Sequence, residues 1–335
     1  MTRPKDNSEF QLIDSIRNQF KSVSEGVLLG ISDDCAIIKK DEENVYLLST
    51  DLLLEGVHFE LKYSSARELG KKAACVNISD IAAMGGNPKY MLTSIAIPKT
   101  VDSGFIKEFY VGVKSVCKKY GVDLVGGDTS SSKKGLFVNI TVIGEAKRGE
   151  CITRCGARVG DGIFVTGNLG NSAGGLAILQ NGHNVSESVK KYLTRKHLSV
   201  VPRVDEGAFL AHSGRVSSMI DISDGIGSDI RRICYESNVG AMINLGLIPV
   251  TKQLKELSQV AKKSVYDYAI SGGEDYELMF TVNSADEEKL MEDYNKRFKK
   301  RAVRIGEITQ GRSVVTVDNA GVKTEISVGY DHFLT

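Results

Sequence analysis

Five segments of this chain place carboxylates beside small or hydroxylated residues where an apolar run ends. They are Ser32-Asp33-Asp34-Cys35, Ser49-Thr50-Asp51, Asn77-Ile78-Ser79-Asp80, Gly126-Gly127-Asp128-Thr129 and Asp221-Ile222-Ser223-Asp224-Gly225. An ionised Asp at the end of a buried strand is costly unless water, a hydrogen-bond donor or a metal satisfies it. One such Asp is typical of a helix cap or a turn. Five such segments favour a shared site. Carboxylates that converge there would repel one another unless divalent cations neutralise them, and such cations also bind phosphates.

These segments suggest phosphate chemistry, but the chain lacks the usual phosphate-binding loop. The chain contains no G-x-x-x-x-G-K-[ST] motif and no G-x-G-x-x-G motif. The glycine-rich segment Gly167–Gly175 follows a predicted strand and opens a predicted helix. It either presents backbone N–H groups to an anion or forms a tight turn. A bound polyphosphate would therefore depend heavily on metal ions, which neutralise it and orient an in-line displacement.

Several other residues could contribute to this site, and each has an ordinary structural alternative. Asp224 could coordinate a metal together with Asp221, or it could cap the helix that follows. His58 is by itself more typical of a structural hydrogen bond than of a ligand contact. Arg154 could reach a phosphate, although most arginines are solvated at the surface. The aromatic residues of the segment Gly329-Tyr330-Asp331-His332-Phe333 could pack the end of the chain or offer a ring to a planar cation.

The composition is that of an ordinary soluble protein and argues against several functions. The chain has 335 residues, of which 41% are hydrophobic and 25% charged, and this length suits two domains. A net charge of +1 and the lack of a basic stripe give no case for nucleic-acid binding. No apolar run predicts a membrane span, and the N-terminus lacks the apolar centre of a signal peptide. The six cysteines complete neither a disulfide framework nor a zinc site, which predicts reduced thiols in a cytoplasmic protein.

Helix and strand patterns alternate along the chain, which predicts an α/β or α+β fold. Apolar residues at helical spacing predict helices at about 8–20, 65–84, 102–119, 176–180, 226–235, 251–262 and 285–297. Short apolar runs predict strands at about 35–38, 45–49, 91–97, 123–125, 136–143, 163–166, 217–222, 241–245, 278–282 and 302–308. We place a domain boundary near residue 150, which gives an N-terminal domain of residues 1–150 and a C-terminal domain of residues 151–335.

Taken in order, the motifs resemble the thiamine-monophosphate kinase family. The resemblance rests on Ile31–Ala36, Ser49–Asp51, Gly56–Phe59, Val76–Gly85, Gly126–Thr129, Thr153-Arg154, Asp221–Gly225, Ser271–Leu278 and Gly329–Phe333, and it runs from near residue 8 to the C-terminus. The acidic segments alone would fit the wider superfamily that contains aminoimidazole ribonucleotide synthetase and selenophosphate synthetase. The segments around His58, Glu274 and Tyr330 favour the thiamine enzyme.

The resemblance implies a two-domain, ATP-binding fold like that of aminoimidazole ribonucleotide synthetase, with mixed sheets and flanking helices. It implies a homodimer with the nucleotide near the interface of the N-terminal domains. The implied Mg²⁺ ligands, some acting through water or backbone oxygen, are Asp34, Ser49, Thr50, Asp51, Asp80, Asp128, Asp221 and Asp224. The implied ATP contacts are Tyr110, Gly127, Asp128, Arg154 and Ser223, and the implied contacts to thiamine monophosphate are His58, Glu274 and Tyr330. Asp33 is either an alternative ligand or a residue that supports the ligands.

The implied reaction transfers the γ-phosphoryl group of ATP to thiamine monophosphate and yields thiamine diphosphate and ADP, as in thiamine diphosphate biosynthesis. No His, Ser or Cys lies in a nucleophile–base motif, so we expect direct in-line transfer assisted by several Mg²⁺ ions. A general base is hardly needed, because a phosphate monoester oxygen is largely ionised near pH 7. The alternatives are another ATP-using member of the superfamily, a Mg²⁺-dependent phosphohydrolase, or a regulator that binds Mg²⁺ or nucleotide without turnover.

Overall fold

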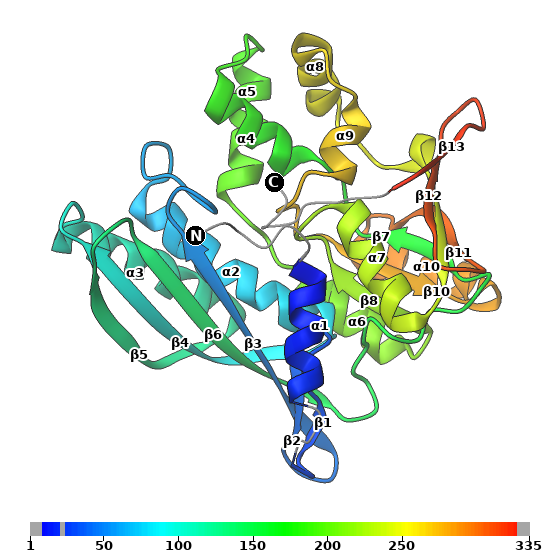
Figure 1. The fold of residues 1–335 in the computed structure, drawn as a ribbon, viewed down its shortest axis with the longest axis horizontal. Coiled ribbons are helices and arrows are strands. Elements are labelled where there is room, and N and C mark those ends of the chain that lie inside the picture. The colour runs from blue at the N-terminus through cyan, green and yellow to red at the C-terminus, as the bar shows by residue number, and fades with distance from the viewer. Residues whose placement is uncertain (1–8, 21–23, 327–335) are drawn as a thin grey trace.

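Two mixed β-sheets with flanking helices make up the fold. The computed structural model describes residues 9–20 and 24–326 of the chain. The first sheet ends at Lys147 and the second begins at Gly162, and helices accompany both (Figure 1). This arrangement confirms the predicted class, whereas the division into domains near residue 150 stays a prediction. None of the helices in the described residues combines the length and apolar character that a membrane crossing requires.

The first sheet has six strands in the order β1-β2-β3-β6-β4-β5. They are β1 (Val27–Leu29), β2 (Ala36–Lys39), β3 (Asn44–Leu54), β4 (Asn87–Pro98), β5 (Asp123–Ser132) and β6 (Phe137–Lys147). Buried residues alternate along β3 and β6, so one face packs beneath the helix pair α2 (Ala66–Ala83) and α3 (Ser103–Tyr120). The other face carries exposed side chains such as Leu52 and Tyr90, and the edge strand β5 is exposed along almost its whole length. In the single chain, therefore, this edge strand and this face meet solvent.

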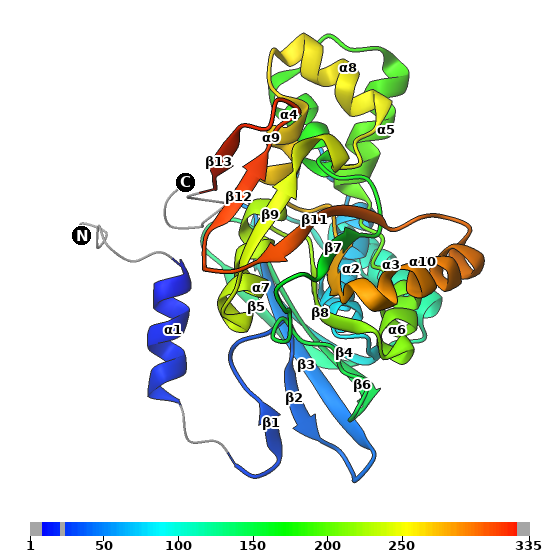
Figure 2. The ribbon, with the colours of Figure 1, turned by 90° about the vertical axis from the view of Figure 1, so that its right-hand side faces the viewer.

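The second sheet has seven strands in the order β13-β12-β9-β11-β7-β10-β8. They are β7 (Gly162–Val165), β8 (Val216–Asp221), β9 (Gly240–Asn244), β10 (Leu278–Val282), β11 (Val303–Thr309), β12 (Val314–Val317) and β13 (Lys323–Glu325). The helices of this half are α4 (Asn171–Asn181), α5 (Glu187–Leu198), α6 (Val204–Ser213), α7 (Ile226–Ser237), α8 (Lys252–Ala261), α9 (Val265–Ile270) and α10 (Ser284–Phe298), with a short 3₁₀ turn at Leu245–Leu247. Helix α1 (Glu9–Gln19) lies on the outside of the molecule (Figure 2), and Tyr235 of α7 donates a hydrogen bond to its Asp14.

Helix α2 occupies the centre of the molecule because its sequence combines a strong start with small side chains. Ser65 and Glu68 form a reciprocal capping box at its N-terminus. Its face toward the sheet is largely alanine, valine and isoleucine, and Gly70 lets α3 approach so closely that an added Cβ would lie 2.0 Å from the Phe109 carbonyl oxygen. On the side of the C-terminal half, Gly207 of α6 approaches the α2 backbone in the same way. Helix α2 therefore contacts both halves of the chain.

Several element boundaries differ from the prediction. Strand β3 was expected to end at Ser49 and β5 to end before Gly126, but both continue, because β6 pairs with β3 through Leu54 and β4 pairs with β5 through Ser132. Helix α4 begins at Asn171, so the last glycines of the segment Gly167–Gly175 are helical. Helices α6 and α9 and strands β1, β12 and β13 were missed, since short elements have weak periodic patterns. For helix α5, only a loop and the start of a helix were expected at 181–191.

We predict that Gly70→Ala destabilises the protein even though alanine is the better helix former. The new Cβ would collide with the backbone of α3, and overpacking of this kind costs about 1–3 kcal/mol. Urea denaturation followed by circular dichroism measures the free energy of unfolding. Gly149→Ala is the control, because nothing lies within 4 Å of its added Cβ, and it should leave that free energy nearly unchanged. An equal effect of the two substitutions would contradict the close packing of α2 and α3.

Candidate functional site

A cavity of about 1080 Å³ lies where the two halves of the chain meet. Its walls include side chains from β3 and α2 on one side and from β8, α7 and α9 on the other. Eleven of the predicted site residues border it: Asp34, Ser49, Thr50, Asp51, His58, Asp80, Arg154, Asp221, Ser223, Asp224 and Glu274. Four of the five acidic segments, all except Gly126–Thr129, thus converge on one space.

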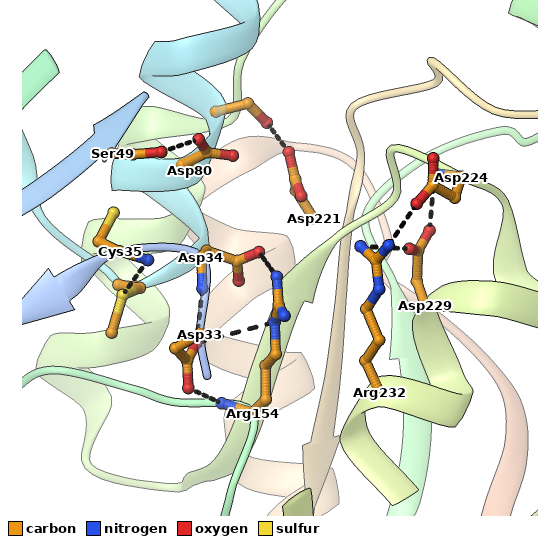
Figure 3. A network of polar contacts seen from close by, with 12 residues as sticks. Asp33, Asp34, Cys35, Ser49, Asp80, Arg154, Asp221, Asp224, Asp229 and Arg232 are labelled. Atoms are coloured by element: carbon orange, nitrogen blue, oxygen red, sulfur yellow. Dashed lines mark hydrogen bonds and ion pairs between the residues drawn. The ribbon is translucent and has the colours of Figure 1, made fainter. Parts of the chain in front are cut away.

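Three carboxylates form the centre of this site. Asp34 precedes β2, Asp80 lies on α2 and Asp221 ends β8, and each offers an oxygen within 4.8 Å of the others. Figure 3 shows the three side chains directed toward one another. Asp34 Oδ2 is buried and has no hydrogen-bond partner among the described residues. A hard divalent cation with oxygen ligands fits this donor set.

Burial and mutual repulsion raise the pKa values of Asp51, Asp80 and Asp221. Burial, reinforced by the charge of Asp34, raises the pKa of Asp221 to about 8. Burial and the charges of Asp51 and Asp221 raise the pKa of Asp80 well above its usual range. The pKa of Asp51 rises to about 6 through burial and the charges of Asp34 and Asp224. The site therefore retains protons near neutral pH unless cations replace them.

Hydroxyl and amide groups hold the carboxylates in place. The Ser49 hydroxyl donates a hydrogen bond to Asp80, and the Ser79 hydroxyl donates to Asp221 Oδ2 over 2.5 Å. The backbone N–H of Asp51 donates to Asn77 Oδ1 over 3.0 Å. Asn77 and Ser79 were not predicted as site residues. Their signal in the sequence is that α2 carries polar residues on a face that is otherwise apolar.

Two arginines neutralise part of the negative charge. Arg154 Nη2 lies 2.5 Å from Asp34 Oδ1, and its backbone N–H donates to Asp33 Oδ2 over 2.9 Å. Asp33 also accepts the backbone N–H of Asp34, so in this structure it holds the loop that carries Asp34. Burial and the charge of Asp34 raise the pKa of Asp33 to about 7.

Arg232 makes the corresponding contact on the other side of the site. Its Nη2 lies 2.6 Å from Asp224 Oδ2, and Nη1 lies 3.7 Å from Asp229 in the same helix (Figure 3). Helix α7 begins after Gly225 with no side-chain cap, so Asp224 is not the N-cap that the sequence allowed. Arg232 was not predicted as a site residue, and its partners Asp224 and Asp229 lie eight and three residues before it in the chain.

Glu274 and His58 border another part of the same cavity. The Glu274 carboxylate lies 2.6 Å from Lys72 Nζ and 3.1 Å from His197 Nδ1. Burial would raise the pKa of Glu274, but the Lys72 and His197 contacts outweigh it and lower that pKa to about 2. His58 Nδ1 accepts the backbone N–H of Leu54 over 3.1 Å. Lys72 and His197 were not predicted, although Lys72 is a charged residue on the apolar face of α2.

Some predicted residues do not reach the carboxylate cavity. Tyr110, Gly127 and Asp128 border a separate hollow of about 470 Å³ over β5 and α3. Thr50 does border the carboxylate cavity, but its side chain bonds to the Ile140 carbonyl oxygen and the Thr141 hydroxyl in the neighbouring strand, so any contribution to a metal would come from its backbone oxygen. Tyr330 lies outside the described residues.

The glycine-rich segment Gly167–Gly175 binds a carboxylate of the chain itself. Asp275 accepts the backbone N–H groups of Gly170 and Ser172 over 2.5 and 3.1 Å. The N-terminus of α4 therefore already has an anionic partner. Gly175 is needed for packing, because an added Cβ would lie 2.2 Å from the Leu193 carbonyl oxygen. In this structure the segment is a packed turn and helix start.

Comparisons with known proteins agree with this site. The models "AIR synthase related protein, N-terminal domain" and "AIR synthase related protein, C-terminal domain" match residues 32–146 and 158–319. Thiamine-monophosphate kinases of Buchnera aphidicola subsp. Acyrthosiphon pisum and Bacillus subtilis are 37% and 36% identical over 332 and 330 residues, covering 97% of this chain and 99% of each relative. A solved structure described as AaThiL complexed with AMPPCP and TMP is 32% identical, with a TM-score of 0.85 and 99% of both chains covered.

We predict that the metal-free protein loses stability as the pH rises from about 5 to about 8. The raised pKa values of Asp51 and Asp221, about 6 and about 8, mean that the folded state holds protons that the unfolded chain has already released. This contribution to stability is complete below the unfolded-state pKa near 4 and is lost as the pH rises through the folded-state values. Thermal melting in EDTA across this range measures the loss.

Saturating Mg²⁺ should reverse that loss, because a cation replaces the protons between the carboxylates. The increase in melting temperature should be larger at about pH 8 than at about pH 6. Asp221→Asn removes one buried charge, so without metal it should melt above the wild type at about pH 8 and should gain less from Mg²⁺. An increase in melting temperature with Mg²⁺ that depends neither on the pH nor on this substitution would contradict a cation site here.

Proposed function

Because the chain belongs to the thiamine-monophosphate kinase family, we propose that it transfers the γ-phosphoryl group of ATP to thiamine monophosphate, releasing thiamine diphosphate and ADP. The observation that carries the proposal is the convergence of Asp34, Asp80 and Asp221 beside Arg154 in a cavity large enough for both substrates. The relatives that bear the name of this activity match over nearly their whole length. The AaThiL complex with AMPPCP and TMP, an ATP analogue and a phosphate acceptor, gives further support.

Mg²⁺ is the cation that we expect these residues to hold. Asp34, Asp80 and Asp221 supply close oxygen ligands, and Asp51 and Asp224 border the same cavity. The unpartnered Asp34 Oδ2 fits this role, since a buried carboxylate oxygen needs a donor or a cation. When bound, Mg²⁺ neutralises phosphate charge, so that one phosphate can approach another. We propose that several ions bind.

The chain's own residues bind and orient the two substrates. The Arg154 guanidinium already faces an anion in the cavity, and a phosphate can take the place of Asp34 as its partner. Ser223 borders the phosphate side, whereas His58 and Glu274 border the side that we assign to thiamine monophosphate. Since the acceptor oxygen is already ionised, the residues need only align it for in-line attack.

A covalent or hydrolytic route through a nucleophilic serine does not fit the geometry. Ser172, His197 and Glu274 have the residue types of a catalytic triad, but Ser172 Oγ and Glu274 Oε2 both lie 3.1 Å from the same imidazole nitrogen, Nδ1. A triad histidine uses one nitrogen for the serine and the other for the carboxylate. We therefore favour direct transfer between the substrates over a phosphoenzyme formed on this serine.

We propose that the active form is a homodimer. Leu124 and Val125 of strand β5 are 43% and 57% exposed, and exposed apolar residues on an edge strand are typical of a pairing surface. Gly127, Asp128 and Tyr110 lie on this surface, apart from the carboxylate cavity of their own chain. They therefore fit a role in a nucleotide site shared between two copies.

A cytoplasmic location is part of the same proposal. All six cysteines lie in the described residues and are free thiols, and four of them are buried, namely Cys35, Cys75, Cys117 and Cys234. Unpaired thiols are typical of a reducing compartment, where ATP is also available as a substrate.

Purified protein incubated with Mg²⁺, ATP and thiamine monophosphate tests the activity directly. We expect thiamine diphosphate and ADP in equal amounts, measured by chromatography. Inorganic phosphate without thiamine diphosphate would establish a phosphohydrolase instead, and ATP binding without turnover would establish a regulator.

We predict that Asp128→Asn and Asp221→Asn each abolish most of the activity, and that mixing the two variants restores part of it. If Asp128 acts in the site of the second copy, a mixed dimer contains one site with both native aspartates. If both residues act within one chain, every site of the mixed dimer lacks one of them. The variants are mixed under conditions that exchange subunits, and turnover is compared with that of each variant alone. Activity no higher than their average would contradict the shared site.

A further inference from the structure

We propose that Lys72 is a positioning residue that assembles the thiamine side of the site, by binding Glu274 and the His58 loop with one buried ammonium group. This inference rests on the proposed function and assigns a role to a residue that was not predicted as a site residue. Lys72 comes from α2 in the first half of the chain, whereas Glu274 comes from the loop before β10 in the second half. The contact therefore sets the spacing between two predicted substrate contacts across the two halves.

Lys72 is buried and paired with specific partners. Its side chain is only 4% exposed. Lysine is almost never buried without a partner, so a buried ammonium group of this kind needs the contacts that it makes. Nζ lies 2.6 Å from Glu274 Oε1 and donates a hydrogen bond to the His58 carbonyl oxygen over 3.1 Å. An ammonium group has three donors, and two of them are used on the two loops that face the substrate.

Glu274 is held through both carboxylate oxygens and through its backbone N–H. Its second carboxylate oxygen lies 3.1 Å from His197 Nδ1, and its backbone N–H donates to the Ser223 carbonyl oxygen over 2.7 Å. Its φ of +68° is in the left-handed region, which a non-glycine residue adopts only when its surroundings compel it. Gly273 precedes it because an added Cβ there would lie 2.2 Å from the Ser223 carbonyl oxygen. A strained backbone that is clamped at both carboxylate oxygens is typical of a functional group held in one orientation.

The clamp also decides what Glu274 can bind. Lys72 and His197 keep the carboxylate ionised, so it acts only as a hydrogen-bond acceptor toward the cavity. Lys72 balances the negative charge of Glu274. The selectivity of this carboxylate for a ligand therefore depends more on the position of its acceptor oxygens than on the net charge attraction. A ligand with an amino group on an aromatic ring, as in the pyrimidine of thiamine, presents the matching donor. A shift of the acceptor by about 1 Å would therefore weaken thiamine monophosphate binding with little effect on ATP.

Lys72→Met tests this role, since methionine keeps much of the length of the side chain and removes the charge. We expect the KM for thiamine monophosphate to rise about tenfold or more, while the KM for ATP changes by less than about twofold. Lys72→Arg retains a cation and should recover part of the affinity for thiamine monophosphate. Lys40→Met is the matched control, because Lys40 forms an exposed pair with Glu145 at 2.7 Å in the same half of the chain. It should leave both KM values unchanged.

A wild-type KM for thiamine monophosphate in Lys72→Met would overturn the inference. Equal increases in both KM values would also overturn it, because they indicate a general loss of structure. If Lys72→Met does not fold, His197→Gln removes the clamp from the other oxygen. That variant should raise the same KM selectively, and an unchanged value would overturn the inference. A wild-type enzyme that forms no thiamine diphosphate would overturn the proposed function itself, which the control reaction separates from a failure of the Lys72 variant alone.

Discussion

The burial of several carboxylates in one cavity is the constraint on which the rest of the structure depends. Left alone, Asp34, Asp80 and Asp221 would repel one another in a low-dielectric space. The chain limits this cost with two arginines, with hydroxyl donors and with protons retained at raised pKa values. None of these compensations satisfies Asp34 Oδ2, so the metal-free site is left incomplete in a way that favours cations and, through them, phosphates.

The parts of this arrangement that follow from local patterns could be predicted from the sequence. Helix α2 and strand β10 lie within a residue of their expected bounds, because their apolar periodicity and flanking turns are strong. The convergence of the acidic segments could also be predicted, since no segment contains the charges that would neutralise its own carboxylates. The resemblance to a family then separated a nucleotide-dependent kinase from other phosphate chemistry, which residue types alone left open.

The rest depends on partners that are distant in the sequence. Gly126-Gly127-Asp128 has the local pattern of a bend, yet it continues a strand because β4 supplies hydrogen-bond partners along it. Likewise, the glycine-rich segment before α4 has the pattern of an anion site, but its anion is Asp275, about a hundred residues later in the chain. The length of the strand and the anion that the loop binds are thus both set by tertiary contacts and not by the local sequence. Asp128 therefore ended on a different surface from the aspartates with which it shares a motif.

The contacts that support the site also join the two halves of the chain. Arg154 with Asp34, Ser79 with Asp221, and Lys72 with Glu274 each pair a residue before position 150 with one after it. The groups that hold the halves together thus include groups to which we assign the binding or orientation of the substrates. In the proposed function a phosphate replaces Asp34 as the partner of Arg154, and one of these contacts is then exchanged for a contact through the ligand. On that proposal, substrate binding is coupled to cohesion between the halves, which gives a reason why buried charges that weaken the empty protein are retained.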